Sequence, residues 1–120
     1  MSEKQLTEYM ATILPSEDIV VIKGWYRDTA RHLDRTFACL HIDCDLYEST
    51  MDALVPLFTK QLVSPGAIIL FDDWNCNRAD PRYGERAAWR ELTERFVIVS
   101  SDEGGYGVAG HKFIVHGYKS

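Results

Sequence analysis

Two short apolar segments of the sequence, residues 40–42 and 68–71, each run directly into acidic residues. The four carboxylates belong to Asp43, Asp45, Asp72 and Asp73. The amphipathic segment between them has a length suited to one helix, so the pattern predicts a strand-helix-strand unit with parallel strands. The carboxyl ends of parallel strands lie at one edge of a sheet, where open α/β folds bind ligands. The four carboxylates are therefore expected to gather at that edge.

Carboxylates that lie close together repel one another, so such a cluster requires protons or a cation. Asp43 and Asp45 are two positions apart and share one face of an extended strand, whereas Asp72 and Asp73 diverge unless the strand has already turned. A hard cation such as Mg²⁺ takes oxygen ligands and usually keeps several waters. The pattern therefore indicates a divalent metal site. The alternative is that one or two of the carboxylates cap a helix and the others are solvated.

The elements that must position these carboxylates follow from hydrophobic periodicity. Strands are predicted at residues 19–22, 36–42, 67–71, 96–100 and 111–116. Helices are predicted at residues 3–14, at 26–33, from an N-cap at Ser49 or Thr50 to about residue 62, and at 83–95. Pro56 predicts a kink or an early break in the third helix. Residues 65–66, Pro-Gly, predict the turn into the next strand.

These elements predict one α/β domain over residues 1–120, with about five strands, mostly parallel, flanked by helices. The run 36–42 has little polar alternation, which is typical of a strand covered on both faces of its sheet. The last two strands are joined by the glycine-rich residues 102–110 and are expected to pair antiparallel. The motif GxGxxG at residues 105–110 is interpreted as this hairpin loop, because no helix follows the glycines as dinucleotide binding requires.

Composition excludes several classes of protein. The chain has 13 basic and 18 acidic side chains and a net charge of −5, which argues against nucleic acid as a partner. No apolar run approaches the roughly 18 residues of a membrane span, and no signal peptide opens the chain, so a cytoplasmic protein is expected. Cys39, Cys44 and Cys76 lack the spacing of a disulfide framework or a zinc site, which fits a reducing compartment.

Other side chains near the acidic segments have a functional and a structural interpretation. His41 alternates with Asp43 and is either a ligand or base or, as we expect, a satisfied strand histidine. Trp74 follows the second acidic pair and is a candidate pocket residue, whereas Trp89 is expected in the core. Three loop arginines either hold an anionic substrate group or form a solvated face, the expected case. They are Arg78, Arg82 and Arg86.

The residues 40–50, LHIDCDLYEST, followed by residues 65–74, PGAIILFDDW, resemble the macrocin O-methyltransferase family. The resemblance extends from about residue 20 to residue 88. It implies a Rossmann-like class I methyltransferase sheet and a reaction in which S-adenosylmethionine methylates a sugar or natural-product hydroxyl with the help of Mg²⁺. By position, Asp43, Asp72 and Asp73 match the metal ligands of the family, and Asp45 matches its general base.

The chain resembles only the carboxyl-terminal half of that family. The strands that carry the glycine-rich turn and the acidic ribose contact have no counterpart before residue 19, so residues that bind S-adenosylmethionine are not identified. A sheet without these strands has an open edge, and an open edge favours pairing with another chain, so a homodimer is expected.

Two other functions fit parts of the pattern. A haloacid-dehalogenase-like phosphatase also has acidic strand ends, but it requires a threonine after the first pair, where this chain has Leu46 and Tyr47. A non-catalytic module that folds by dimerising is the other alternative.

Overall fold

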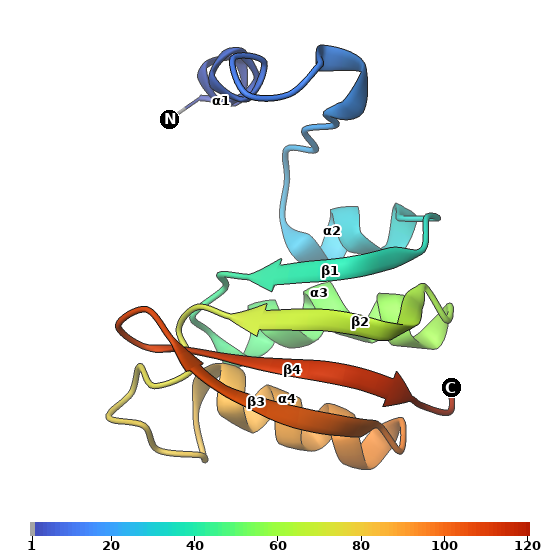
Figure 1. Cartoon of the computed structure of the whole chain (residues 1–120), viewed down its shortest axis with the longest axis vertical. Coiled ribbons are helices and arrows are strands. Elements are labelled where there is room, and N and C mark those ends of the chain that lie inside the picture. The colour runs from blue at the N-terminus through green and yellow to red at the C-terminus, as the bar shows by residue number, and fades with distance from the viewer. Residues whose placement is uncertain (1) are drawn as a thin grey trace.

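The computed structural model describes residues 2–120 and has one mixed β-sheet over that range (Figure 1). Its four strands are β1 (Phe37–Ile42), β2 (Val63–Phe71), β3 (Val99–Tyr106) and β4 (Gly110–Gly117), in the order β1-β2-β4-β3. β1 and β2 are parallel, whereas β4 is antiparallel to both of its neighbours. The α/β class and the carboxyl-terminal hairpin are confirmed. The described sheet has four strands rather than about five, and one of its three pairings is parallel.

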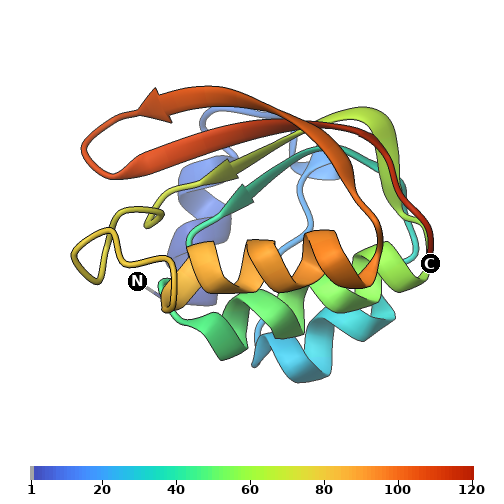
Figure 2. The same cartoon turned by 90° about the horizontal axis from the view of Figure 1, so that it is seen from below.

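Two helices, α3 (Tyr47–Thr59) and α4 (Gly84–Arg95), lie side by side against one face of the sheet (Figure 2). Between them and the sheet lies the core, in which Leu54, Phe58 and Leu92 from the helices meet Ile69 and Phe71 from β2. All five side chains are fully buried. Burial of a side chain of this size stabilises the fold by about 1.5–3 kcal/mol, so these contacts hold α3 and α4 against the sheet.

The opposite face of the sheet is partly open, so the predicted burial of both faces is wrong. On β1, Leu40 and Ile42 point into the core while Cys39 and His41 are exposed. On β2, Ile69 is fully buried while its neighbour Ile68 is 40% exposed. Alternate side chains of a strand point to opposite faces, so this pattern places the helices on one face only. The alternation of buried and exposed positions was not visible in the sequence, because the exposed positions include a cysteine and an isoleucine.

The amino-terminal segment lies apart from the sheet (Figure 1). Helix α1 (Glu3–Met10) has a capping box formed by Ser2 and Gln5 but no buried residue, and it ends four residues before the predicted end. The strand predicted at residues 19–22 is wrong, since this extended segment pairs with no strand and Val20 is 78% exposed. The helix predicted at 26–33 is present as α2 (Tyr26–Thr29) followed by the 3-10 turn Ala30–His32.

The third helix begins earlier than predicted. Its N-cap is Leu46. Thr50 lies inside the helix, where its hydroxyl donates to the Leu46 carbonyl at 2.8 Å, so it does not act as the N-cap. Pro56 does not end α3, which continues to Thr59. After the helix, Gln61 adopts a left-handed φ of 58°, and the Leu62 amide donates to the Leu57 carbonyl at 2.8 Å. This hydrogen bond closes the helix with a Schellman motif and turns the chain into β2.

The remaining elements follow the prediction with shifted ends. β2 starts at Val63, and the Pro65-Gly66 pair lies within it where the register with β1 shifts. Helix α4 occupies the predicted range within one residue. The GxGxxG segment lies in the β3–β4 hairpin, where Tyr106 pairs with Gly110, so its interpretation as a hairpin loop is confirmed. No helix within residues 2–120 has the length and hydropathy needed to cross a bilayer.

Candidate metal centre

The acidic residues lie where the two parallel strands leave the sheet. Ile42 of β1 pairs with Phe71 of β2, and the amide of Asp72 donates to the Ile42 carbonyl at 2.9 Å. The two chains therefore emerge side by side. Beyond them, carboxylate oxygens of Asp43, Asp72 and Asp73 all lie within 4.8 Å of one another. The structure thus brings together the three residues that the resemblance assigns to a metal.

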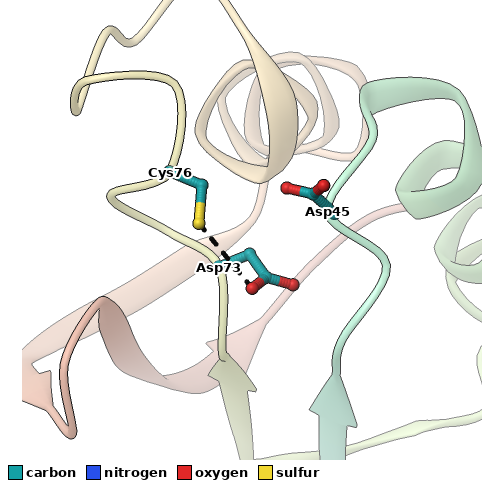
Figure 3. A group of neighbouring side chains, drawn as sticks. All are labelled: Asp45, Asp73 and Cys76. Atoms are coloured by element: carbon teal, nitrogen blue, oxygen red, sulfur yellow. Dashed lines mark hydrogen bonds between the residues drawn. The ribbon is translucent and has the colours of Figure 1, made fainter.

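Asp45 lies at the same edge and is also close to Asp73. A carboxylate oxygen of Asp45, one of Asp73 and the thiol sulfur of Cys76 lie within 4.8 Å of one another (Figure 3). The Cys76 thiol donates to Oδ1 of Asp73 at 3.7 Å. All four predicted carboxylates therefore form one continuous cluster with Asp73 at its centre.

The backbone at Asp45 is held in a tight turn. Its φ is 62°, in the left-handed region, and the Leu46 amide donates to the Cys44 carbonyl at 2.6 Å across it. Left-handed backbone is unfavourable for residues other than glycine, although aspartate tolerates it better than most. Strained backbone of this kind concentrates at functional sites. Here it directs the Asp45 side chain back toward Asp73 (Figure 3).

The electrostatics of the cluster favour a cation. Burial raises the pKa of Asp73, and a hydrogen bond and negative charge from Asp43, with further charge from Asp45 and Asp72, raise it further. An opposite charge among these groups would favour their ionised forms. All the carboxylate donors are hard oxygen atoms, the ligands that Mg²⁺ prefers. The residues present therefore fit a divalent cation.

Two side chains from the sheet flank Asp72. Nε2 of His41 lies 3.5 Å from Oδ1 of Asp72, so this carboxylate is a polar partner for the histidine. That His41 is a satisfied strand histidine rather than a ligand or base stays a prediction. The Tyr106 hydroxyl donates to the same oxygen at 3.5 Å, and burial together with the Asp72 charge raises the pKa of Tyr106 to about 12. The sequence did not indicate Tyr106, because only the β3–β4 hairpin brings it to this edge.

A fifth carboxylate lies beneath the cluster. Glu85, in the first turn of α4, is fully buried. Its oxygens accept hydrogen bonds from the backbone amides of Cys44, at 3.2 Å, and Asp73, at 3.0 Å. Burial raises the pKa of Glu85 to about 7, although the amide donors act in the opposite direction. The sequence shows an acidic residue in the first turn of this helix, but a favourable interaction with the helix dipole explains such a residue equally well.

The tryptophan and arginine candidates have mainly structural contacts. Trp89 is in the core, as predicted, at 4% exposure. Trp74 packs on the core, with His111 stacked on its ring at 5.4 Å and the Arg86 guanidinium 5.5 Å from it. Arg86 also donates to the Ala79 carbonyl at 2.8 Å and so holds the loop between β2 and α4.

The other two arginines lie on the surface of that loop. Arg82 pairs with Asp80 at 2.7 Å, and Arg78 and Arg82 line an open hollow with Tyr83. This arrangement matches the expected solvated face and gives no separate support for an anion site.

The α/β fold is a Rossmann-like methyltransferase fold, as its match to a solved O-methyltransferase structure shows. The chain belongs to the macrocin O-methyltransferase (TylF) family, whose model matches residues 2–95. This membership leaves the phosphatase alternative without support.

Individual relatives agree with the family assignment. The chain is 33% identical over 92 residues to the demethyldecarbamoylnovobiocin O-methyltransferase of Streptomyces niveus, a match that covers 74% of this chain and 34% of the relative. It is 36% identical over 62 residues to the 8-demethyl-8-(2,3-dimethoxy-alpha-L-rhamnosyl)-tetracenomycin-C 4'-O-methyltransferase of Streptomyces olivaceus, a match covering 51% of this chain and 23% of the relative.

The solved structure of the O-methyltransferase NovP superposes with a TM-score of 0.76 at 28% identity. The match covers 95% of this chain and 45% of NovP. The chain thus spans about a third of the length of the first curated relative and less than half of NovP. Within residues 2–120, no strand is followed by a glycine-rich turn and a helix.

Proposed function

We propose that this chain is the metal-binding and acceptor-binding part of an S-adenosylmethionine-dependent O-methyltransferase. The acceptor is a hydroxyl of a small molecule, a sugar or another natural product. The observation that carries the proposal is the convergence of Asp43, Asp72 and Asp73 at the carboxyl edge of β1 and β2, with Asp45 beside them. The family and the relatives named above supply the reaction class.

Asp43, Asp72 and Asp73 are proposed to hold Mg²⁺ through their carboxylate oxygens. Bound there, the ion would orient the acceptor hydroxyl and lower its pKa, since a free hydroxyl is a poor nucleophile. The pKa of Asp73, which is raised by burial and then by the neighbouring carboxylates, supports this assignment, because a cation stabilises the ionised forms of such a cluster.

Asp45 is proposed to be the general base. A carboxylate within hydrogen-bond reach of the acceptor takes its proton as the methyl group of S-adenosylmethionine is transferred. The tight turn at Asp45 supports this role, because the Asp45 carboxylate lies within 4.8 Å of that of Asp73, a proposed metal ligand. The acceptor oxygen would bond to the methyl carbon as the bond from that carbon to the sulfonium sulfur breaks, S-adenosylhomocysteine would leave with the electron pair on sulfur, and the proton would remain on Asp45.

We further propose that the chain forms a homodimer in the cytoplasm. Among residues 2–120, β1 pairs with β2 alone, and an unpaired strand edge favours association with another chain. The three free cysteines fit a reducing compartment. Analytical ultracentrifugation tests the dimer directly, since a monomer at micromolar concentration would contradict it.

The reaction is tested by mixing the chain with S-adenosylmethionine, Mg²⁺ and acceptors of the kind that the relatives' names state, and measuring the methylated product by mass spectrometry. The Asp45→Asn variant should lose at least about 100-fold in rate, the lower range for removal of a general base. Glu48→Gln, an exposed neighbour on α3, is the matched control and should retain the rate. Binding of Mg²⁺ without any methyl transfer would instead favour the non-catalytic module.

A further inference from the structure

Glu85 is the buried charged side chain closest to the proposed metal ligands, and it belongs to neither acidic strand end. It is 0% exposed and lies in the first turn of α4. Burying a carboxylate is costly unless its oxygens are hydrogen-bonded. Here the two oxygens have different partners: Oε2 accepts from the Cys44 amide and Oε1 accepts from the Asp73 amide.

Those two amides belong to the two loops that carry the cluster. Cys44 lies between Asp43 and Asp45, and Asp73 is itself a proposed ligand. The last backbone hydrogen bond between the loops, among the described residues, runs from Asp72 to Ile42. Beyond that point the carboxylate of Glu85 accepts a backbone amide from each loop and so joins the two backbones.

The start of α4 is packed tightly against the same loops. Gly84 has a φ of 61°, and a Cβ placed on it would lie 3.1 Å from the Asp45 carbonyl oxygen and 2.8 Å from Nδ2 of Asn77. A larger residue would therefore push the helix away from the site. The close approach that glycine permits brings Glu85 within reach of both amides.

We propose that Glu85 is a positioning residue that sets the separation of the two ligand-bearing loops, and thereby the affinity of the site for its divalent cation. The inference rests on the proposed metal site. It assigns no ligand role to Glu85, whose two oxygens are already engaged by backbone amides.

The chemistry of the side chain makes the proposal specific. A carboxylate offers two acceptor oxygens, one for each loop. Glutamine has the same shape but one acceptor, and its NH₂ group would face an amide donor. Glu85→Gln therefore breaks one of the two links with little change in volume. Removal of residues that orient metal ligands typically lowers metal affinity by 10–100-fold.

The two hydrogen bonds are tested first in the wild-type, metal-free chain. Through-hydrogen-bond scalar couplings in the NMR spectrum should connect the amide nitrogens of Cys44 and Asp73 with the Glu85 carboxyl carbon, and both amide protons should shift upfield in Glu85→Gln. Absence of these couplings together with unchanged shifts would overturn the proposal without the need for a stable variant.

Metal affinity is then measured by titration with Mn²⁺, followed by electron paramagnetic resonance. Glu85→Gln should raise the Kd by about 10–100-fold. Two controls on α4 should leave it within about twofold of the wild type, because neither touches the loops: exposed Glu91→Gln makes the same chemical change, and buried Leu92→Val weakens the helix packing.

The outcomes distinguish failure of the metal site from failure of the positioning role of Glu85. A wild-type chain that takes up no Mn²⁺ overturns the metal site and the role of Glu85 with it. A wild-type chain that binds Mn²⁺ with the same Kd as Glu85→Gln overturns only the positioning role. An equal loss of affinity in Leu92→Val would show that helix stability, rather than the two hydrogen bonds, controls the site, and this result also overturns the proposal.

Discussion

Nε2 of His41 lies 3.5 Å from Oδ1 of Asp72. His41 points to the face of the sheet opposite the core, because its neighbours Leu40 and Ile42 are in the core. Both side chains are about half exposed, at 52% and 44%. The contact places an imidazole next to a proposed metal ligand, which leaves two possible roles for His41. It is either a ligand of the site or a neighbour of it.

His41→Gln distinguishes the two roles. Exposed ion pairs contribute at most about 1 kcal/mol, so a neighbour should change the Kd for Mn²⁺ by less than about fivefold. We expect this small effect, because water screens both groups. Isothermal titration measures it, with His32→Gln, an exposed histidine in the turn after α2, as the matched control. A loss of 100-fold or more would make His41 a ligand.

The acidic strand ends could be predicted because each depends on local sequence. A strand-helix-strand unit places the carboxyl ends of its strands together whatever the rest of the chain does, so Asp43, Asp72 and Asp73 met as expected. Tyr106 could not be predicted, since its approach to Asp72 depends on the register of the β3–β4 hairpin. Glu85 depends on how closely Gly84 lets α4 approach, which no pattern in the sequence encodes.

The misplaced elements have a similar explanation. Residues 19–22 have the β-branched composition of a strand, but a strand forms only where a neighbour can pair with it, and none of the described residues does so. The prediction that the strand 36–42 is covered on both faces failed because a cysteine, here Cys39, is usually buried but lies exposed. In both cases tertiary context overrode local preference.

Asp73→Asn should weaken metal binding by about 100-fold or more and also stabilise the metal-free chain. The pKa of Asp73 is raised above its ordinary value of 3.8, so ionising this group disfavours the folded state. The folded chain therefore loses stability as pH rises from that value through the raised pKa, and the asparagine variant removes this loss. Thermal melting in EDTA at pH 4 and pH 8 measures the effect.

Asp80→Asn is the control for that experiment, because Arg82 lowers the pKa of Asp80 to about 2 in an exposed pair. It should leave metal affinity unchanged and should not stabilise the metal-free chain. Stabilisation by Asp80→Asn equal to that by Asp73→Asn would contradict the account of repulsion within the cluster.

The reactivity of the Cys44 thiol toward iodoacetamide should depend steeply on pH. Burial raises the pKa of Cys44 to about 11, so about one thiol in a thousand is ionised at pH 8. In a chain with Cys39→Ser and Cys76→Ser, the alkylation rate of Cys44 should rise about tenfold per pH unit from pH 7 to 9.5 without a plateau. Mass spectrometry follows the reaction. A plateau below pH 9 would show that Cys44 is not held in this buried environment.

Val97→Gly should stabilise the fold by about 1 kcal/mol. Val97 follows the cap of α4 with a φ of 50°, and the Ile98 amide donates to the Thr93 carbonyl at 3.0 Å, which forms a Schellman motif. Glycine is favoured at this position, whereas a β-branched residue is strained there. Urea unfolding measures the difference. Val99→Gly, an exposed strand position, is the control and should destabilise the chain.

The central claim is that the carboxylates at the ends of β1 and β2 share one divalent cation. It is tested most directly by titrating the wild-type chain and the Asp43→Asn, Asp72→Asn and Asp73→Asn variants with Mn²⁺ under electron paramagnetic resonance. We predict one bound ion per wild-type chain and a loss of about 100-fold or more in affinity for each variant. A wild-type chain that leaves Mn²⁺ free in solution, or variants that bind it as tightly as the wild type, would contradict the claim.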